Sequence, residues 1–222
     1  MTGSDMGLFF RSRRYCIAAL LLGAWLGLSQ AQTAPQTAAR TVLVLGDSLS
    51  AEYGLARGTG WVALLEQRLA KEKPGTRVIN ASISGETTFG GRSRLAALLA
   101  QHKPTHVILE LGGNDALRGL ALDATRANLE WMTQQSRQAG ARVLLLGMQM
   151  PPNYGADYAK RFEGLYAQVA RAEKAGLVPF FLKGVADGPD PTRLFQPDRI
   201  HPTAEAQPLM LANVWPELKK LL

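Results

Sequence analysis

Five short apolar segments alternate with longer amphipathic stretches along most of the chain. Each segment is rich in Val, Ile or Leu and is bounded by Gly, Pro or Asn, a pattern that predicts strands. The segments are almost continuously apolar instead of alternating with polar residues, which indicates strands buried on both faces of a parallel sheet. The predicted strands are residues 41–45, 77–81, 105–111, 142–148 and 178–182.

The stretches between the predicted strands carry apolar residues at helical spacing. Leu95, Leu98 and Leu99 fall at i, i+3 and i+4, which places them on one helix face. The alternating order implies right-handed crossovers and a three-layer α/β/α sandwich with a five-stranded parallel sheet, a flavodoxin-like architecture. Such sheets bind ligands at the carboxyl ends of their strands, so we expect chemistry in the loops after the strands.

The loop after the first predicted strand reads Gly-Asp-Ser-Leu-Ser over residues 46–50. It matches neither glycine-rich nucleotide-binding pattern, and it differs from the G-x-S-x-G motif of α/β-hydrolases. A plain turn is one interpretation. The other is that Ser48 starts the following helix, where it is an exposed nucleophile above a positive helix terminus.

The loops after the second and third predicted strands are built from small and amide residues. Gly85 is an ordinary turn residue, but its missing side chain also lets a backbone N–H approach a ligand closely. Asn114 lies in Gly-Gly-Asn-Asp, which is common turn chemistry. Its carboxamide can nevertheless donate a hydrogen bond into the same crevice.

One of the three histidines follows the fifth predicted strand. A lone histidine is more often structural than catalytic, but His201 stands three residues after Asp198, a carboxylate that can orient its ring. The other two histidines are poorly placed. His102 ends a predicted helix, and His106 opens a strand at its amino end, which is the opposite edge of the sheet.

Taken together, the order of these segments resembles the four sequence blocks of the SGNH/GDSL hydrolase superfamily. The resemblance extends from Thr41 to the last predicted helix. Residues 45–51, 80–85, 109–115 and 152–155 are further similar to the multifunctional periplasmic acyl-CoA thioesterases, lysophospholipases and arylesterases of Gram-negative bacteria. The resemblance therefore implies a serine esterase or thioesterase that acts on aryl esters, acyl-CoA and lysophospholipids through an acyl-enzyme.

The resemblance also implies a role for each site residue. Ser48 is expected to attack the acyl carbonyl, His201 to take its proton, and Asp198 to fix the imidazole tautomer. The oxyanion is expected to accept hydrogen bonds from the backbone N–H groups of Ser48 and Gly85 and from the side chain of Asn114. No metal or organic cofactor is expected.

Substrate-binding residues are expected on two further loops. Residues 116–121 form a plain connection or, by the resemblance, a mobile loop that closes Leu117 and Leu120 over the acyl chain. Met150 and Pro151 are expected to add an apolar wall. These side chains favour medium to long acyl chains, whereas an alternative on the same scaffold, a carbohydrate O-deacetylase, needs a shallow polar groove. A flavodoxin-like binding module without activity is the second alternative.

Three residues depart from the pattern of this narrower group of thioesterases, lysophospholipases and arylesterases. Glu86 stands where Asp is usual, Arg199 stands where Gly is common, and Glu52 lies in a segment that is usually small. None of them removes a catalytic group. Each borders the expected site, so each can alter the substrate preference.

Composition adds an export signal to this picture. The chain has 222 residues, 46% of them apolar, and one cysteine, which suits one core without a disulfide framework. Three arginines within residues 11–14 precede an uncharged apolar run at 16–28, and Ala31 ends a small-residue cleavage site. We therefore predict a signal peptide over 1–31, which directs export to the periplasm or beyond. A polar lead-in over 32–40 and one hydrolase domain over 41–222 follow it.

The charge balance points to a small substrate. The formal net charge is +7, and removal of the predicted signal peptide leaves 22 basic and 17 acidic side chains, a net +5. No dense basic run accompanies this excess, so we expect no nucleic-acid partner and no stable membrane anchor after cleavage. The expected partner is a small acyl ester or thioester, and the expected state is a monomer.

Overall fold

The computed structural model describes residues 40–150 and 154–222. The predicted signal peptide over 1–31 lies outside the described residues, as do Pro151 and all of the predicted lead-in except Arg40. Within the described part, no helix is long and apolar enough to cross a membrane.

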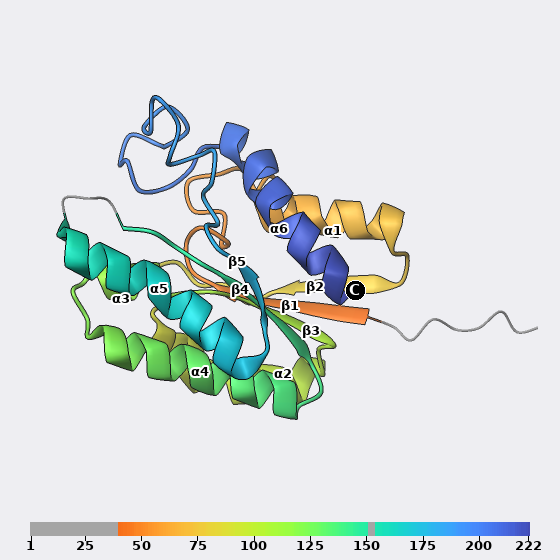
Figure 1. Cartoon of the computed structure of the whole chain (residues 1–222). Helices are drawn as coiled ribbons and strands as arrows, with labels where there is room; N and C mark the ends of the chain where they lie inside the picture. Colours follow the sequence, from red (N-terminus) through yellow and green to blue (C-terminus); the bar gives the residue numbers. More distant parts are fainter. Residues whose placement is uncertain (1–39, 151–153) are drawn as a thin grey trace, which may run out of the picture. The chain divides into compact units, whose positions relative to one another are not determined.

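A five-stranded parallel sheet forms the centre of the fold, in the order β2-β1-β3-β4-β5 (Figure 1). The chain winds from β1 toward one edge and then returns to build the other side from β3. The loops after β1 and β3 therefore diverge and leave a crevice between them, where such sheets bind ligands. The strands are β1 Arg40–Gly46, β2 Thr76–Asn80, β3 His106–Glu110, β4 Arg142–Leu146 and β5 Gly176–Val178.

Helices cover both faces of the sheet (Figure 1). α1 packs beside α6 on one face, and α2, α4 and α5 pack side by side on the other. The predicted three-layer α/β/α sandwich is thus confirmed. The helices are α1 Trp61–Glu72, α2 Thr88–His102, the short α3 Gly113–Leu117, α4 Leu122–Gln138, α5 Ala156–Glu173 and α6 Gln207–Leu221, which a 3-10 turn, Ala204–Ala206, precedes.

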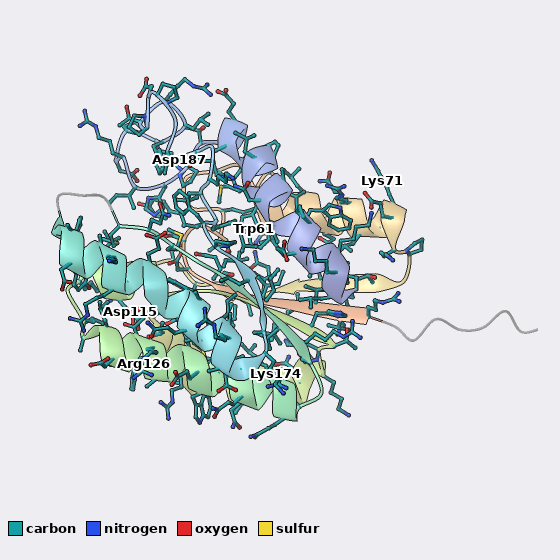
Figure 2. All side chains as sticks on the ribbon, viewed as in Figure 1. Trp61, Lys71, Asp115, Arg126, Lys174 and Asp187 are labelled. Atoms are coloured by element: carbon teal, nitrogen blue, oxygen red, sulfur yellow. The ribbon has the colours of Figure 1, made fainter. Side chains whose placement is uncertain are left out.

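The core fills the space between the sheet and the helices. Val42 and Leu45 of β1 are fully buried, as is Trp61 at the start of α1, whose ring meets the edge of Phe181 with 5.4 Å between centroids. In contrast, Lys71 extends from the last turn of α1 into solvent (Figure 2). Each buried Leu or Val contributes about 1.5–3 kcal/mol relative to an exposed one, so the apolar runs that predict the strands also hold them in place.

The fifth strand differs from its prediction. It spans Gly176–Val178 instead of 178–182, whereas the other four strands begin and end within two residues of expectation. Pro179 follows Val178 and has no N–H with which to continue the ladder. The chain turns instead, and the N–H of Phe181 donates to the carbonyl of Gly147 at 2.8 Å. Phe181 and Leu182 are buried in this turn, which explains why their apolar character resembles a strand.

His106 serves the fold at the amino edge of the sheet, away from the ligand-binding edge. Its Nε2 lies 2.8 Å from the carbonyl oxygen of Leu221, and its Nδ1 lies 2.8 Å from Oγ1 of Thr105. Burial lowers the pKa of His106 below its ordinary 6.5, and the charges of Arg142 and Arg40 lower it further, against the hydrogen bond to Leu221. The neutral imidazole therefore ties the end of α6 to β3.

This depressed pKa predicts a loss of stability in acid. The unfolded chain binds a proton at this residue once the pH falls below 6.5, while the folded chain resists it, so the free energy of unfolding should fall as the pH drops from 6.5 toward the lower folded pKa. His106→Gln should flatten this part of the pH dependence and cost about 1–2 kcal/mol at neutral pH. Urea unfolding at several pH values measures the free energy of unfolding and its pH dependence. If the pH dependence of His106→Gln equalled that of the wild type, His106 would not be its cause.

Candidate active site

A cleft of about 590 Å³ opens at the carboxyl edge of the sheet. This volume lies within the usual range for small-molecule sites. Loops that follow all five strands contribute to its walls, as the topology predicts. Among the lining residues are Ser48, Gly85, Asn114, Met150 and His201.

Ser48, His201 and Asp198 form a chain of hydrogen bonds at this cleft. Nε2 of His201 lies 2.9 Å from Oγ of Ser48, and Nδ1 lies 2.6 Å from Oδ2 of Asp198. The hydrogen bond from the ring of His201, followed by those from the N–H groups of His201 and Ile200, lowers the pKa of Asp198 to about 2. An ionised Asp198 can only accept, so Nδ1 carries the hydrogen and Nε2 is left as the acceptor for the serine proton.

Ser48 does not start a helix, so that part of the sequence interpretation is wrong. The N–H groups of Ser50 and Ala51 donate to the carbonyl of Asp47 at 3.2 and 3.0 Å, which makes a single turn. Glu52 then adopts a left-handed φ of 59°, which a continuing right-handed helix cannot contain. α1 begins only at Trp61, and no helix terminus lies directly under the serine.

Tyr53 and Gln196 are two site residues that the sequence did not reveal. The ring of Tyr53 lies against that of His201, with 4.2 Å between centroids. Nε2 of Gln196 donates to the carbonyls of Tyr53 and Pro202 at 2.9 and 3.1 Å. Gln196 therefore fastens the loop after β1 to the turn that carries the imidazole. In the sequence, the one indication of a role for Tyr53 and Gln196 is that they lie in the loops that carry Ser48 and His201.

Gly85 and Asn114 line the cleft beside the serine. Gly85 has a φ of +79°, a left-handed conformation that side chains disfavour. Its carbonyl accepts a hydrogen bond of 2.9 Å from Arg118. Nδ2 of Asn114 donates one hydrogen to Oδ2 of Asp47 at 3.0 Å, which fixes the orientation of the amide. The second hydrogen of this amide remains to be donated to a ligand.

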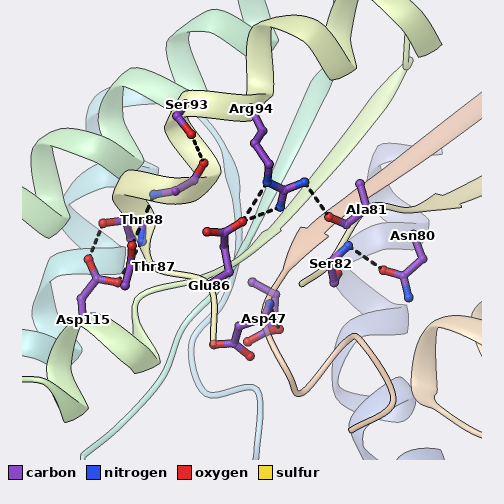
Figure 3. A network of polar contacts seen from close by, with 12 residues as sticks. Asp47, Asn80, Ala81, Ser82, Glu86, Thr87, Thr88, Ser93, Arg94 and Asp115 are labelled. Atoms are coloured by element: carbon purple, nitrogen blue, oxygen red, sulfur yellow. Dashed lines mark hydrogen bonds and ion pairs between the residues drawn. The ribbon is translucent and has the colours of Figure 1, made fainter. Parts of the chain in front are cut away.

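The loops of Gly85 and Asn114 are bonded to each other through Asp115 (Figure 3). This buried carboxylate accepts from the N–H of Thr88 at 2.9 Å and from its hydroxyl. Asn128 of α4 donates to the same hydroxyl at 3.1 Å. Asp115 thus holds two potential oxyanion donors in register. The sequence contains Asp115 at the end of Gly-Gly-Asn-Asp, but the sequence alone assigned it no role.

Two of the three departures identified in the sequence, Glu86 and Glu52, hold loops beside the site. The carboxylate of Glu86 pairs with Arg94 at 2.7 Å, and Arg94 also donates to the carbonyl of Ala81 at 3.1 Å (Figure 3). This bridge closes the base of the loop that contains Gly85. Glu52 accepts from the N–H of Gly60 at 2.8 Å and from that of Gly58, which orders residues 52–60.

A pair of buried carboxyl groups lies under the serine loop. Oε2 of Glu110 accepts from the hydroxyl of Ser50 at 2.7 Å and from the backbone N–H of Asp47 at 3.3 Å. Burial raises the pKa of Asp47 to about 6. Burial, and then the charge of Asp47, raise the pKa of Glu110 well above its ordinary value. Glu110 therefore keeps its proton, and Asp47 remains an acceptor for Asn114.

The predicted substrate-binding residues are only partly brought together. Leu117 and Met150 line the cleft. Leu120 does not, which corrects its predicted role: Gly119 takes a φ of +66° and turns the chain away, leaving Leu120 41% exposed. Pro151 lies outside the described residues. Apolar lining that the sequence did not identify comes from Met148, Phe180, Leu182 and Phe195.

Comparisons with known proteins agree with this architecture. The model of the GDSL-like lipase/acylhydrolase family matches residues 44–208. Esterase TesA of Pseudomonas aeruginosa is 53% identical over 204 residues, which cover 92% of this chain and 99% of that protein. The thioesterase 1/protease 1/lysophospholipase L1 of Escherichia coli K12 is 40% identical over 185 residues, which cover 83% and 86%. A crystal structure of TesA matches with a TM-score of 0.79 at 55% identity, over 82% of this chain and 100% of that one.

The protonated state assigned to Glu110 predicts different effects for two substitutions. Glu110→Gln keeps an uncharged donor and acceptor of similar shape, so the free energy of unfolding should stay within about 1 kcal/mol of the wild type. Glu110→Ala opens a cavity and removes a partner from Ser50 and Asp47, which should cost about 2–4 kcal/mol. Urea unfolding at neutral pH compares them. Equally large losses in both variants would show that Glu110 is buried as an anion.

Proposed function

Because the chain belongs to the GDSL-like lipase/acylhydrolase family, we propose that it is a serine esterase that hydrolyses acyl esters and thioesters. The observation that carries the proposal is the hydrogen-bonded chain Ser48–His201–Asp198 at the wall of an apolar cleft. The names of two relatives, an esterase and a thioesterase/lysophospholipase, support the same chemistry.

In the proposed acylation step, Oγ of Ser48 attacks the acyl carbonyl while Nε2 of His201 takes its proton. The distance of 2.9 Å between these atoms is within the reach of direct proton transfer. Asp198 holds the hydrogen on Nδ1 and stabilises the imidazolium that forms. Tyr53, whose ring lies tilted by 35° against that of His201, limits the ways in which the imidazole can turn.

The developing oxyanion is stabilised by donors that are already in place. We assign the backbone N–H groups of Ser48 and Gly85 and the second amide hydrogen of Asn114 to this role. Removing one donor of this kind typically costs about 3–4 kcal/mol, or roughly 100- to 1000-fold in kcat. The contacts of Asp47 with Asn114 and of Asp115 with Thr88 keep these donors from reorganising during the reaction.

The imidazolium of His201 then protonates the leaving alkoxide or thiolate, and the ester bond breaks to leave an acyl-Ser48. A water molecule enters, gives a proton to Nε2 of His201 and attacks the acyl carbon. Collapse of the second tetrahedral intermediate breaks the bond to Oγ, which recovers its proton from His201 as the free acid departs.

The acyl chain is proposed to lie along the apolar part of the cleft. Leu117, Met148, Met150, Phe180 and Leu182 present side chains there, and each buried methylene contributes about 0.8 kcal/mol. Such a wall suits medium to long chains. The leaving group needs few specific contacts, so we propose aryl esters, acyl-CoA and lysophospholipids as substrates.

Substitution of the proposed nucleophile and base tests the mechanism. Ser48→Ala and His201→Ala should each lower kcat by about 10⁵-fold or more, and the double variant should be little worse, because the three residues act as a unit. A fluorophosphonate probe should label the wild type and not Ser48→Ala. Circular dichroism checks that the variants are folded. Substantial turnover by folded Ser48→Ala would end the proposal.

A chain-length series tests the acyl site. Along p-nitrophenyl esters from acetyl to dodecanoyl, kcat/KM should rise by up to about fourfold for each methylene that the cleft buries, and then level off. An acetylated polysaccharide serves as the comparison substrate. Preference for acetyl groups in both assays would instead support a carbohydrate O-deacetylase.

A further inference from the structure

Arg199 stands in a strained turn next to the proposed base. It is not a glycine, yet its φ is +58°, in the left-handed region that side chains disfavour. Three hydrogen bonds hold the turn in this conformation. The N–H of Arg199 donates to the carbonyl of Gln196 at 2.9 Å, and the N–H groups of Ile200 and His201 donate to the carboxylate of Asp198. Strain that is retained beside an active site is a reason to look for a function of the side chain.

The guanidinium of Arg199 is a cation that the protein does not neutralise. The residue is exposed and lines the cleft. It makes no ion pair with any residue in 40–150 or 154–222. Among the described residues that line the cleft, Asp47 is the one acidic residue, and its buried carboxyl is engaged by Leu49 and Asn114. The charge of Arg199 is therefore available to a ligand.

Arg199 lies on the side of the cleft where the leaving group of the substrate is expected. The oxyanion donors Gly85 and Asn114 fix where the carbonyl oxygen lies, and His201 must reach the leaving-group atom to protonate it. The leaving group therefore lies on the side of His201, two residues from Arg199. Arg118, in contrast, is bonded to the carbonyl of Gly85 and so belongs to the oxyanion side.

We propose that Arg199 binds an anionic phosphate in the leaving group and gives the enzyme a preference for acyl esters that carry one. The inference rests on the proposed esterase function and specifies its leaving-group site. Guanidinium groups suit phosphate because their N–H donors match two phosphate oxygens. In a lysophospholipid only three carbon atoms separate the scissile ester oxygen from the phosphate ester oxygen, whereas acyl-CoA places its long pantetheine arm between them. A glycerophosphate leaving group is therefore the better match to a residue that lines the same cleft and lies in the same turn as His201.

The test compares two substrates that differ only in phosphate. Octanoyl-lysophosphatidate and monooctanoylglycerol carry the same acyl chain, and octanoyl-CoA provides the distant phosphate. Arg199→Gln keeps the strained backbone and removes the charge, so the ratio of kcat/KM for lysophosphatidate over monooctanoylglycerol should fall about three- to tenfold, mainly through KM. Arg199→Lys should retain most of the ratio. Added salt should lower the ratio in the wild type and have less effect in Arg199→Gln.

Arg57→Gln is the matched control. Arg57 is exposed but does not line the cleft, so its loss changes net charge equally and should leave the ratio within about twofold. An unchanged ratio in Arg199→Gln, or an equal fall in Arg57→Gln, would overturn the inference, as would an effect confined to octanoyl-CoA. Failure of the esterase proposal is distinguishable, because the wild type would then not hydrolyse monooctanoylglycerol, or Ser48→Ala would hydrolyse it as well as the wild type does.

Discussion

The contact between the buried carboxyl groups of Glu110 and Asp47 is the interaction on which the rest of the site depends. Glu110 ends β3 and Asp47 follows β1, so the pair spans the crevice where the winding of the sheet reverses. Two neighbouring buried anions would repel each other, and the charge of Asp47 accordingly raises the pKa of Glu110. Retention of the proton on Glu110 removes this repulsion. Asp47 can then hold the amide of Asn114 while its own backbone positions Ser48.

Hydrogen bonds between loops extend this arrangement to the remaining groups of the site. The parallel sheet brings the ends of its strands to one edge, but the loops there have no ladder to align them. Asp115 aligns the loop of Gly85 with that of Asn114, and Gln196 aligns Tyr53 with the turn of His201. The proposed nucleophile, base and oxyanion donors are thus held by hydrogen bonds within and between these loops.

The sequence predicted those features that depend on local pattern or on the general geometry of parallel sheets. Buried apolar runs located four strands closely, and the carboxyl edge of the sheet directed attention to Ser48, Gly85, Asn114 and His201. The errors arise where a contact distant in sequence, or a single backbone angle, decides the outcome. Pro179 ends β5 early, and the left-handed Glu52 prevents a helix under the serine. Likewise, the stacking of Tyr53 on His201 and the protonation of Glu110 depend on partners that no local pattern identifies.

Two aspartates of the same site show how the environment assigns different roles to one residue type. Asp198 is partly exposed, and the ring and N–H groups that donate to it lower its pKa to about 2, so it is ionised throughout the neutral range. Asp47 is buried, and desolvation raises its pKa to about 6. Hydrogen bonds to the charged form dominate in the first case and loss of hydration in the second. Asp198, which is hydrogen-bonded to the ring of His201, can therefore stabilise an imidazolium, whereas Asp47 acts as the acceptor that orients the amide of Asn114.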